Sequence, residues 1–292
     1  MIQIKEFLKY VDISDLHDKI CAFRELDFKK LDYQEVQNEI AKVISFETPS
    51  GSCSYLTPVS ASYPSGTRFY RVRNIAEGDT RLPLKSMSTV SDCWEPPSQV
   101  VKAGRLNRER ESLLYTAPMA PDIAIEELKV VDDQNFSLIV YEALTPIKVT
   151  GIGFPPNIEG LSKDEILKLR MIQDFLKHEF VRDVGYGTEY LYRISESITK
   201  DYFDLPPDVQ DAWCYPSVAK KGGYNVCFRP TAKQKLSLVG VQIAAVKREE
   251  SGYLFNVKLI AKDSGDGINL SYHGIGSPEQ ETLFPEITAE KI

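Results

Sequence analysis

Residues 1–46 have the hydrophobic spacing of helices. Apolar side chains recur at three- and four-residue intervals in two runs: Ile13, Leu16, Ile20 and Phe23, then Val36, Ile40, Val43 and Ile44. Glu35 lies three residues after Asp32, which is the spacing of a capping box. Residues 48–66 are rich in Ser, Pro and Gly and interrupt the periodicity. We therefore expect a small helical region with its linker at 1–64 and a second domain at 65–292.

The pattern after residue 65 mixes strands with helices. A helix is expected from about Pro121, and a long one after Ser162, where Glu165 completes a second capping box. Runs of β-branched and aromatic residues of strand length occur at 67–73, 112–116, 135–142, 225–228, 236–246 and 253–260. Because strands and helices do not alternate regularly, the fold class expected is α+β.

Composition and charge exclude several classes of protein. The 292-residue chain has a formal net charge of −7, which argues against broad non-specific binding to nucleic acid. Five scattered cysteines without a CxxC pair predict a reducing compartment and no zinc site. The amino terminus does not resemble a secretory signal, and the longest apolar run, residues 236–246, is too short to span a bilayer. A cytoplasmic protein without a bound metal is expected.

Arginines crowd one predicted strand. Alternation in Arg68–Arg73 places Phe69, Arg71 and Arg73 on one face, and Tyr70 and Val72 on the other. Guanidinium groups bind phosphates and stack on rings, so the strand is typical of a site for a planar anionic ligand. A solvated edge strand explains the same pattern.

Two further clusters contain polar residues suited to a binding site. The first runs from Gly104-Arg105-Leu106-Asn107 through Tyr115 to a helix with Glu126 and Glu127. The second joins Trp213–Ser217 to Gly222–Asn225, where two glycines permit close backbone approach. Ordinary structural roles, including a turn before the strand at Val226, are equally consistent with these residues.

Other apparent motifs are weak. Gly151-Ile152-Gly153 lacks the third glycine of a dinucleotide fingerprint and is followed by two prolines. The three histidines, His17, His178 and His273, are dispersed in sequence, so no serine or cysteine hydrolase triad is expected.

Taken in order, the polar clusters resemble the RES family over about Thr67 to Val246. Phe69-Tyr70-Arg71, Gly104-Arg105-Leu106-Asn107, Tyr115-Thr116-Ala117, Glu126, and Tyr215-Pro216-Ser217 with Gly223-Tyr224-Asn225 resemble its successive motifs. Leu106 departs from the family's tryptophan, and residues 74–103 are longer than in compact members.

The resemblance implies a split β-sandwich similar to that of ADP-ribosyltransferases, acting on NAD+. Members of the family degrade NAD+ by hydrolysis or phosphorolysis, usually as toxins restrained by a cognate antitoxin. By this resemblance Glu126, Arg105, Tyr115 and Ser217 are catalytic. The residues implied to bind NAD+ are Arg71, Arg105, Asn107, Tyr115, Ser217 and Asn225.

Two alternative functions stay open at this point. ADP-ribose could be transferred to a protein instead of water or phosphate, or the chain could be a non-catalytic nucleotide-binding module. The amphipathic faces of the amino-terminal helices favour interaction, either as a homo-oligomer or in placing the second domain. Of the adjacent glutamates, Glu126 has the tyrosine-to-glutamate interval of the family, and Glu127 is expected to be a solvated helix residue.

Overall fold

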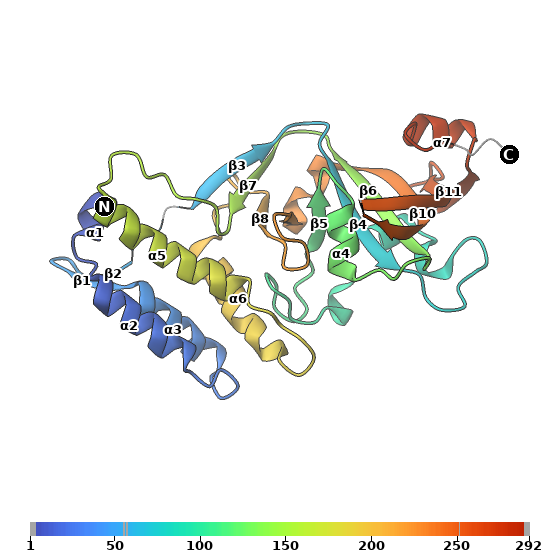
Figure 1. Ribbon diagram of the computed structural model, residues 1–292. Helices are drawn as coiled ribbons and strands as arrows, with labels where there is room; N and C mark the ends of the chain where they lie inside the picture. The colour runs from blue at the N-terminus through green and yellow to red at the C-terminus, as the bar shows by residue number, and fades with distance from the viewer. Residues whose placement is uncertain (1–3, 55, 57, 251, 289–292) are drawn as a thin grey trace. The chain divides into compact units, whose positions relative to one another are not determined.

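The chain forms two compact units that interleave along the sequence. The computed structural model describes residues 4–54, 56, 58–250 and 252–288. Unit 1 comprises Met1–Ala61, Ser98–Glu111 and Val149–Pro216, and unit 2 comprises Ser62–Pro97, Ser112–Lys148 and Ser217–Ile292. Helices do not alternate regularly with strands (Figure 1), and the strand pairs of unit 2 are antiparallel, so the predicted α+β class is confirmed.

Unit 1 is mainly helical. Its helices are α1 (Ile4–Leu8), α2 (Ile13–Arg24), α3 (Tyr33–Ile44), α5 (Lys163–Phe180) and α6 (Tyr192–Tyr202). Its strands are β1 (Phe46–Thr48), β2 (Gly51–Cys53) and most of β3 (Val59–Tyr63), β7 (Ile147–Gly151) and β8 (Ala212–Pro216). The predicted capping boxes at Asp32 and Ser162 begin α3 and α5. Strands β7 and β8 pair in parallel.

The helices of unit 1 share one core, which crosses the boundary expected from the sequence. Phe23 of α2 packs edge-on against Phe175 of α5, with ring centroids 5.1 Å apart. Helix α3 lies beside α6 in the same unit (Figure 1). The amphipathic faces of residues 1–46 are thus buried against a later part of the chain, and the compact units differ from the continuous division into 1–64 and 65–292.

The Ser/Pro/Gly-rich stretch at 48–66 is more regular than its composition predicts. A tight turn pairs Thr48 with Gly51, where φ is +101°, and lets β2 return along β1. Strand β3 occupies much of the remainder. Because short strands need only a partner and a turn, composition alone does not exclude them.

Unit 2 contains an antiparallel run of seven strands in the order β12-β11-β10-β6-β4-β5-β9. Their bounds are β4 (Arg68–Asn74), β5 (Leu114–Pro118), β6 (Phe136–Ala143), β9 (Tyr224–Phe228), β10 (Leu236–Glu249), β11 (Gly252–Asp263) and β12 (Leu270–Gly274). The two α-helices of the described part of this unit are α4 (Asp122–Leu128) and α7 (Pro278–Leu283). The six strand-length runs expected from the sequence correspond to β4, β5, β6, β9, β10 and β11.

The two faces of this sheet have different roles. Tyr70 and Val72 lie on the face that α4 covers through Ile123, Ala124 and Ile125, in one apolar cluster of the unit. Phe69, Arg71 and Arg73 lie on the other face, as alternation predicts, because Tyr70 is paired with Ala117 and Phe69 with Pro118. Helix α4 therefore presents its polar residues beside one face only.

Candidate functional site

The strongest convergence of predicted site residues is at Glu127, at the end of α4. Its Oε1 accepts hydrogen bonds from Ser217 Oγ and from Asn225 Nδ2, each at 2.6 Å. Ser217 is 8% exposed and Asn225 6% exposed, whereas Glu127 is exposed. Within the described residues Oε2 makes no hydrogen bond or ion pair. Two buried donors thus hold one carboxylate oxygen and leave the other open to a ligand.

The segment after β8 is folded locally to aim Ser217 at Glu127. The Ser217 hydroxyl accepts from the Lys220 amide at 3.0 Å, and the Ser217 amide donates to the Gly223 carbonyl at 2.9 Å. A Cβ on Gly223 would lie 3.1 Å from Ile123 of α4, so this glycine permits close approach. Lys220 Nζ forms an ion pair with Asp122, and this ion pair holds the turn close to the start of α4.

Tyr115 lies on the same face as this carboxylate cluster. In the β5–β9 pair Tyr115 is opposite Cys227, two residues from Asn225, and residues two apart in a strand share a face. The ring is half-buried. Tyr115, Ser217 and Asn225 are therefore brought to one side of the sheet, which is the grouping that a site shared by the three residues would need.

Glu126 is directed elsewhere. Its Oε1 accepts from the hydroxyl of Tyr253 on β11, and its Oε2 lies 3.9 Å from Arg248 Nη2 on β10. Burial, followed by the hydrogen bond with Glu126, raises the pKa of Tyr253 to about 12. The structure therefore does not bring Glu126 to Ser217 and Asn225. Adjacent helical residues point about 100° apart, so only one of the two carboxylates can do so.

Arg71 is on the opposite face of the sheet from Tyr115 and α4. Its Nη1 donates to the Trp94 carbonyl, and Arg73 donates to the Asp92 carbonyl. Tyr141 of β6 lies on this same face and donates to the Cys93 carbonyl. These side chains hold residues 92–94 against the sheet. The expected grouping of Arg71 with the glutamate is not found, because alternation separates them.

Two buried groups on this face, Cys93 and Tyr141, should make the stability of unit 2 sensitive to alkaline pH. Burial raises the pKa of the Cys93 thiol to about 12 and also raises the pKa of Tyr141. Both groups are neutral in the folded protein and ionise more readily when unfolded, so the stability they contribute is present below pH about 8.5 and lost as pH rises through the folded pKa values. We expect the urea midpoint of unit 2 to fall between pH 8 and pH 10.5. Cys93→Ala should make that fall smaller, and an unchanged pH dependence in the variant would remove Cys93 as a cause.

Arg105 and Asn107 belong to unit 1, where both have structural partners. Arg105 Nη1 donates to the carbonyls of Phe180 and Arg182, at the carboxyl end of α5, where a cation complements the helix dipole. Asn107 is buried and donates to the carbonyls of Lys102 and Arg108. Leu106 is fully buried. The motif therefore closes a loop and caps a helix.

Glu127 is exposed, as expected for a solvated helix residue, but its hydrogen bonds to Ser217 and Asn225 were not expected, although the helical phase contained a signal for them. The apolar residues Ile123, Ala124, Ile125 and Leu128 centre near Ala124. At about 100° per residue, Glu127 is about 85° from the mean direction of these apolar residues and Glu126 about 175°. Glu127 is thus on the side of α4 that meets side chains from β9 and the turn before it, whereas Glu126 faces Tyr253 of β11 and Arg248 of β10.

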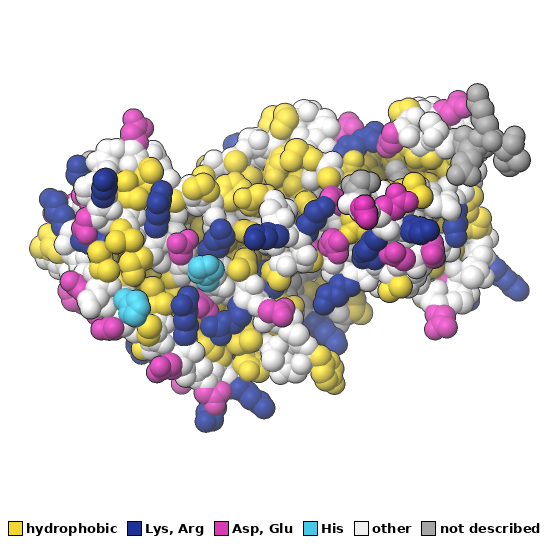
Figure 2. All heavy atoms as spheres, in the orientation of Figure 1, with side chains coloured by type: hydrophobic (Ala, Val, Ile, Leu, Met, Phe, Trp, Pro, Cys, Tyr) yellow, Lys and Arg dark blue, Asp and Glu magenta, His cyan; other side chains and the backbone are white. Residues whose placement is uncertain are grey.

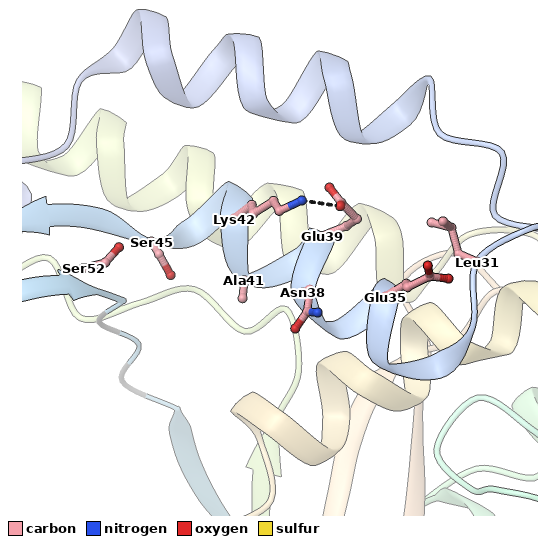
Figure 3. Close-up of a pocket in the computed structure, with 8 residues that line it drawn as sticks. All are labelled: Leu31, Glu35, Asn38, Glu39, Ala41, Lys42, Ser45 and Ser52. Atoms are coloured by element: carbon pink, nitrogen blue, oxygen red, sulfur yellow. Dashed lines mark hydrogen bonds and ion pairs between the residues drawn. The ribbon is translucent and has the colours of Figure 1, made fainter.

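Unit 1 has a surface pocket that contains none of the predicted site residues. It lies along α3 and β2, and Figure 3 shows its polar lining. Lys42 is paired with Glu39 at 2.5 Å, and Glu35 forms the capping box with Asp32. Because these charges already have partners within α3, the Glu127 cluster is the better candidate.

The described residues contain no group of three or more His, Cys, Asp or Glu side chains arranged to hold a metal ion. No helix in the described ranges combines the length and the apolar character needed to cross a bilayer. Figure 2 shows acidic and basic side chains interspersed on the visible face, without a broad basic surface.

Comparison with known proteins gives no relative. No protein-family model matches the chain, and neither a curated protein nor a solved structure matches it.

Proposed function

We propose that unit 2 contains a site that cleaves the bond between nicotinamide and ribose in NAD+, with Glu127 as its carboxylate. The observation that carries the proposal is the double hydrogen bond to Glu127 Oε1 from Ser217 and Asn225. It joins three residue types that the RES resemblance implies at one site, with Glu127 in place of Glu126. The finer fold, an ADP-ribosyltransferase-like split sandwich, is part of the same proposal.

The chemistry requires a fixed negative charge near a developing cation. Cleavage of the glycosidic bond passes through an oxocarbenium-like state, and nicotinamide leaves as a neutral ring, so no general acid is needed. Ser217 and Asn225 hold Oε1, which leaves the open Oε2 of Glu127 to bind a ribose hydroxyl and stabilise the cation. Tyr115 would stack on or donate to the nicotinamide end. Water, phosphate or a protein side chain would accept ADP-ribose.

One observation favours a second candidate, a non-catalytic nucleotide-binding module. Arg71 and Arg105, the expected partners of the pyrophosphate, both donate to backbone carbonyls. A site without free guanidinium groups holds phosphates less firmly, because it lacks the bidentate contacts that arginine supplies. The two candidates can be distinguished because only the enzyme releases free nicotinamide.

The test is to mix purified full-length protein with NAD+ and to measure nicotinamide and the ADP-ribose products by chromatography. The proposal predicts release that depends on protein concentration, with ADP-ribose, ADP-ribose phosphate or a modified protein as the partner product. Saturable NAD+ binding without nicotinamide release would instead support the binding module. If the protein neither binds NAD+ nor releases nicotinamide, NAD+ is neither its substrate nor its ligand.

The resemblance extends the proposal to the cell. A cytoplasmic enzyme of this kind would deplete NAD+ and arrest growth when expressed alone, and a cognate antitoxin would protect the cell by covering the site. Self-association through the amino-terminal region belongs to the same set of proposals, although the apolar faces of α2 and α3 already contribute to the core of unit 1.

A further inference from the structure

A serine, a histidine and a glutamate meet in unit 2, away from the residues assigned to NAD+. Ser271 and His273 are two residues apart on β12 and so share one face. The distance from Ser271 Oγ to His273 Nε2 is 3.0 Å, and His273 Nδ1 lies 3.4 Å from Glu279 Oε2 on α7. The histidine side chain is 21% exposed and that of Glu279 is 35% exposed. The group is open to a small molecule.

The order of these contacts is that of a nucleophile, a base and an orienting acid. In the tautomer that carries its proton on Nδ1, that proton is on the side of the Glu279 carboxylate and Nε2 has the free lone pair of the ring. Nε2 then accepts the hydroxyl proton of Ser271. The other acceptor near that hydroxyl, the Lys262 carbonyl, is farther away at 3.5 Å. This arrangement is the one by which a histidine activates a serine for attack on a carbonyl.

A cation is available on the same face. Lys262 of β11 is directly opposite Ser271 in the antiparallel pair, which places their Cβ atoms about 5 Å apart. The Lys262 ammonium has no hydrogen bond or ion pair with a described residue. It can therefore stabilise the negative charge that forms on the carbonyl oxygen of an ester when the carbonyl carbon bonds to Ser271 Oγ.

We propose that Ser271 and His273 form a second reactive site, which hydrolyses carboxylic esters by acyl transfer. Ser271 Oγ bonds to the acyl carbon while its proton passes to His273 Nε2, and the ester C–O bond breaks as that proton passes to the leaving alcohol. Water then attacks the acyl-serine, its proton passes through the same nitrogen, and the carboxylic acid and free serine are released. Glu279 is a positioning residue, because it touches the histidine and not the substrate.

The first experiment uses a fluorophosphonate, whose phosphorus bonds to an activated serine with loss of fluoride. Full-length protein should gain one adduct, and peptide mass mapping should locate it at Ser271. Ser271→Ala should remove the adduct. His273→Gln should lower the labelling rate by about 10²-fold or more, the scale of general-base catalysis. Circular dichroism would check that each variant keeps its fold.

A second measurement separates positioning from a purely structural effect. With p-nitrophenyl acetate as the ester, Glu279→Gln should lower kcat and leave KM unchanged, because the ester does not contact Glu279. The matched control is Glu281→Gln, two residues farther along α7 and so about 160° around the helix from Glu279; both constants should stay at their wild-type values. Absence of an adduct at Ser271 in folded protein, or equal labelling rates in wild type and His273→Gln, would overturn the proposal.

Discussion

Glu127→Gln is expected to lower the rate of nicotinamide release by about 10²-fold or more, the scale seen when one electrostatic stabiliser of a transition state is removed. The amide keeps the size of the side chain and can still accept from Ser217 and Asn225 through its oxygen. It loses the negative charge that the oxocarbenium-like state needs. Because the charge acts mainly in the transition state, NAD+ affinity should change little. Single-turnover rates and a binding isotherm measure the two effects separately.

The neighbouring residue supplies the control for this prediction. Glu126→Gln removes a charge from the same helix turn but from the group around Tyr253 and Arg248, so turnover should stay within about twofold of wild type. If Glu126→Gln were the inactive variant and Glu127→Gln the active one, the tyrosine-to-glutamate interval would be the better guide to the catalytic carboxylate. Full activity in both variants would exclude a glutamate of α4 from the reaction.

Phe23→Ala is expected to destabilise unit 1 by about 3–5 kcal/mol, the usual cost of removing a buried ring and leaving a cavity. Phe23 is 2% exposed and contacts the rings of Phe28 and Phe175. A substitution in the amino-terminal region should therefore unfold α5 as well. Urea unfolding, followed by circular dichroism and by hydrogen exchange in residues 163–180, would measure both effects.

A double-mutant cycle tests whether α2 and α5 share this core. Phe23→Ala and Phe175→Ala should couple by about 0.5–1.5 kcal/mol, the range for edge-on aromatic pairs. Leu167→Ala, on the exposed side of α5 where the side chain is 48% exposed, should change stability by no more than about 0.5 kcal/mol. Additive effects of the two phenylalanine substitutions would show that the amino-terminal helices fold independently, as a boundary near residue 64 implies.

Local signals in the sequence predicted the elements well. Asp32 with Glu35, and Ser162 with Glu165, mark the starts of α3 and α5 because capping depends only on residues a few positions apart. Alternation in β4 correctly separated Arg71 from Tyr70, since the period of a strand is two. The same alternation places Ser271 beside His273, although the dispersed histidines had argued against a triad.

Contacts between distant segments account for what could not be predicted. The sequence does not reveal that the Trp94 carbonyl satisfies Arg71 or that the end of α5 satisfies Arg105, because each partner lies 23 or more positions away. The sequence alone therefore predicts a ligand for both arginines. The choice of Glu127 over Glu126 depended on the position of Asn225, 98 residues later. The chemical types of these residues are enough to suggest a binding site, but their contacts are known only from the three-dimensional structure.

The interleaving of the two units has a genetic consequence. Each unit is encoded by three separate stretches of the gene, so any uninterrupted fragment that carries one unit whole also carries parts of the other. Recombination at one crossover point would split the core of at least one unit, which makes modular exchange with other genes an improbable route of divergence. The two units are thus expected to be inherited together, and to diverge by point substitution and by insertions in exposed loops.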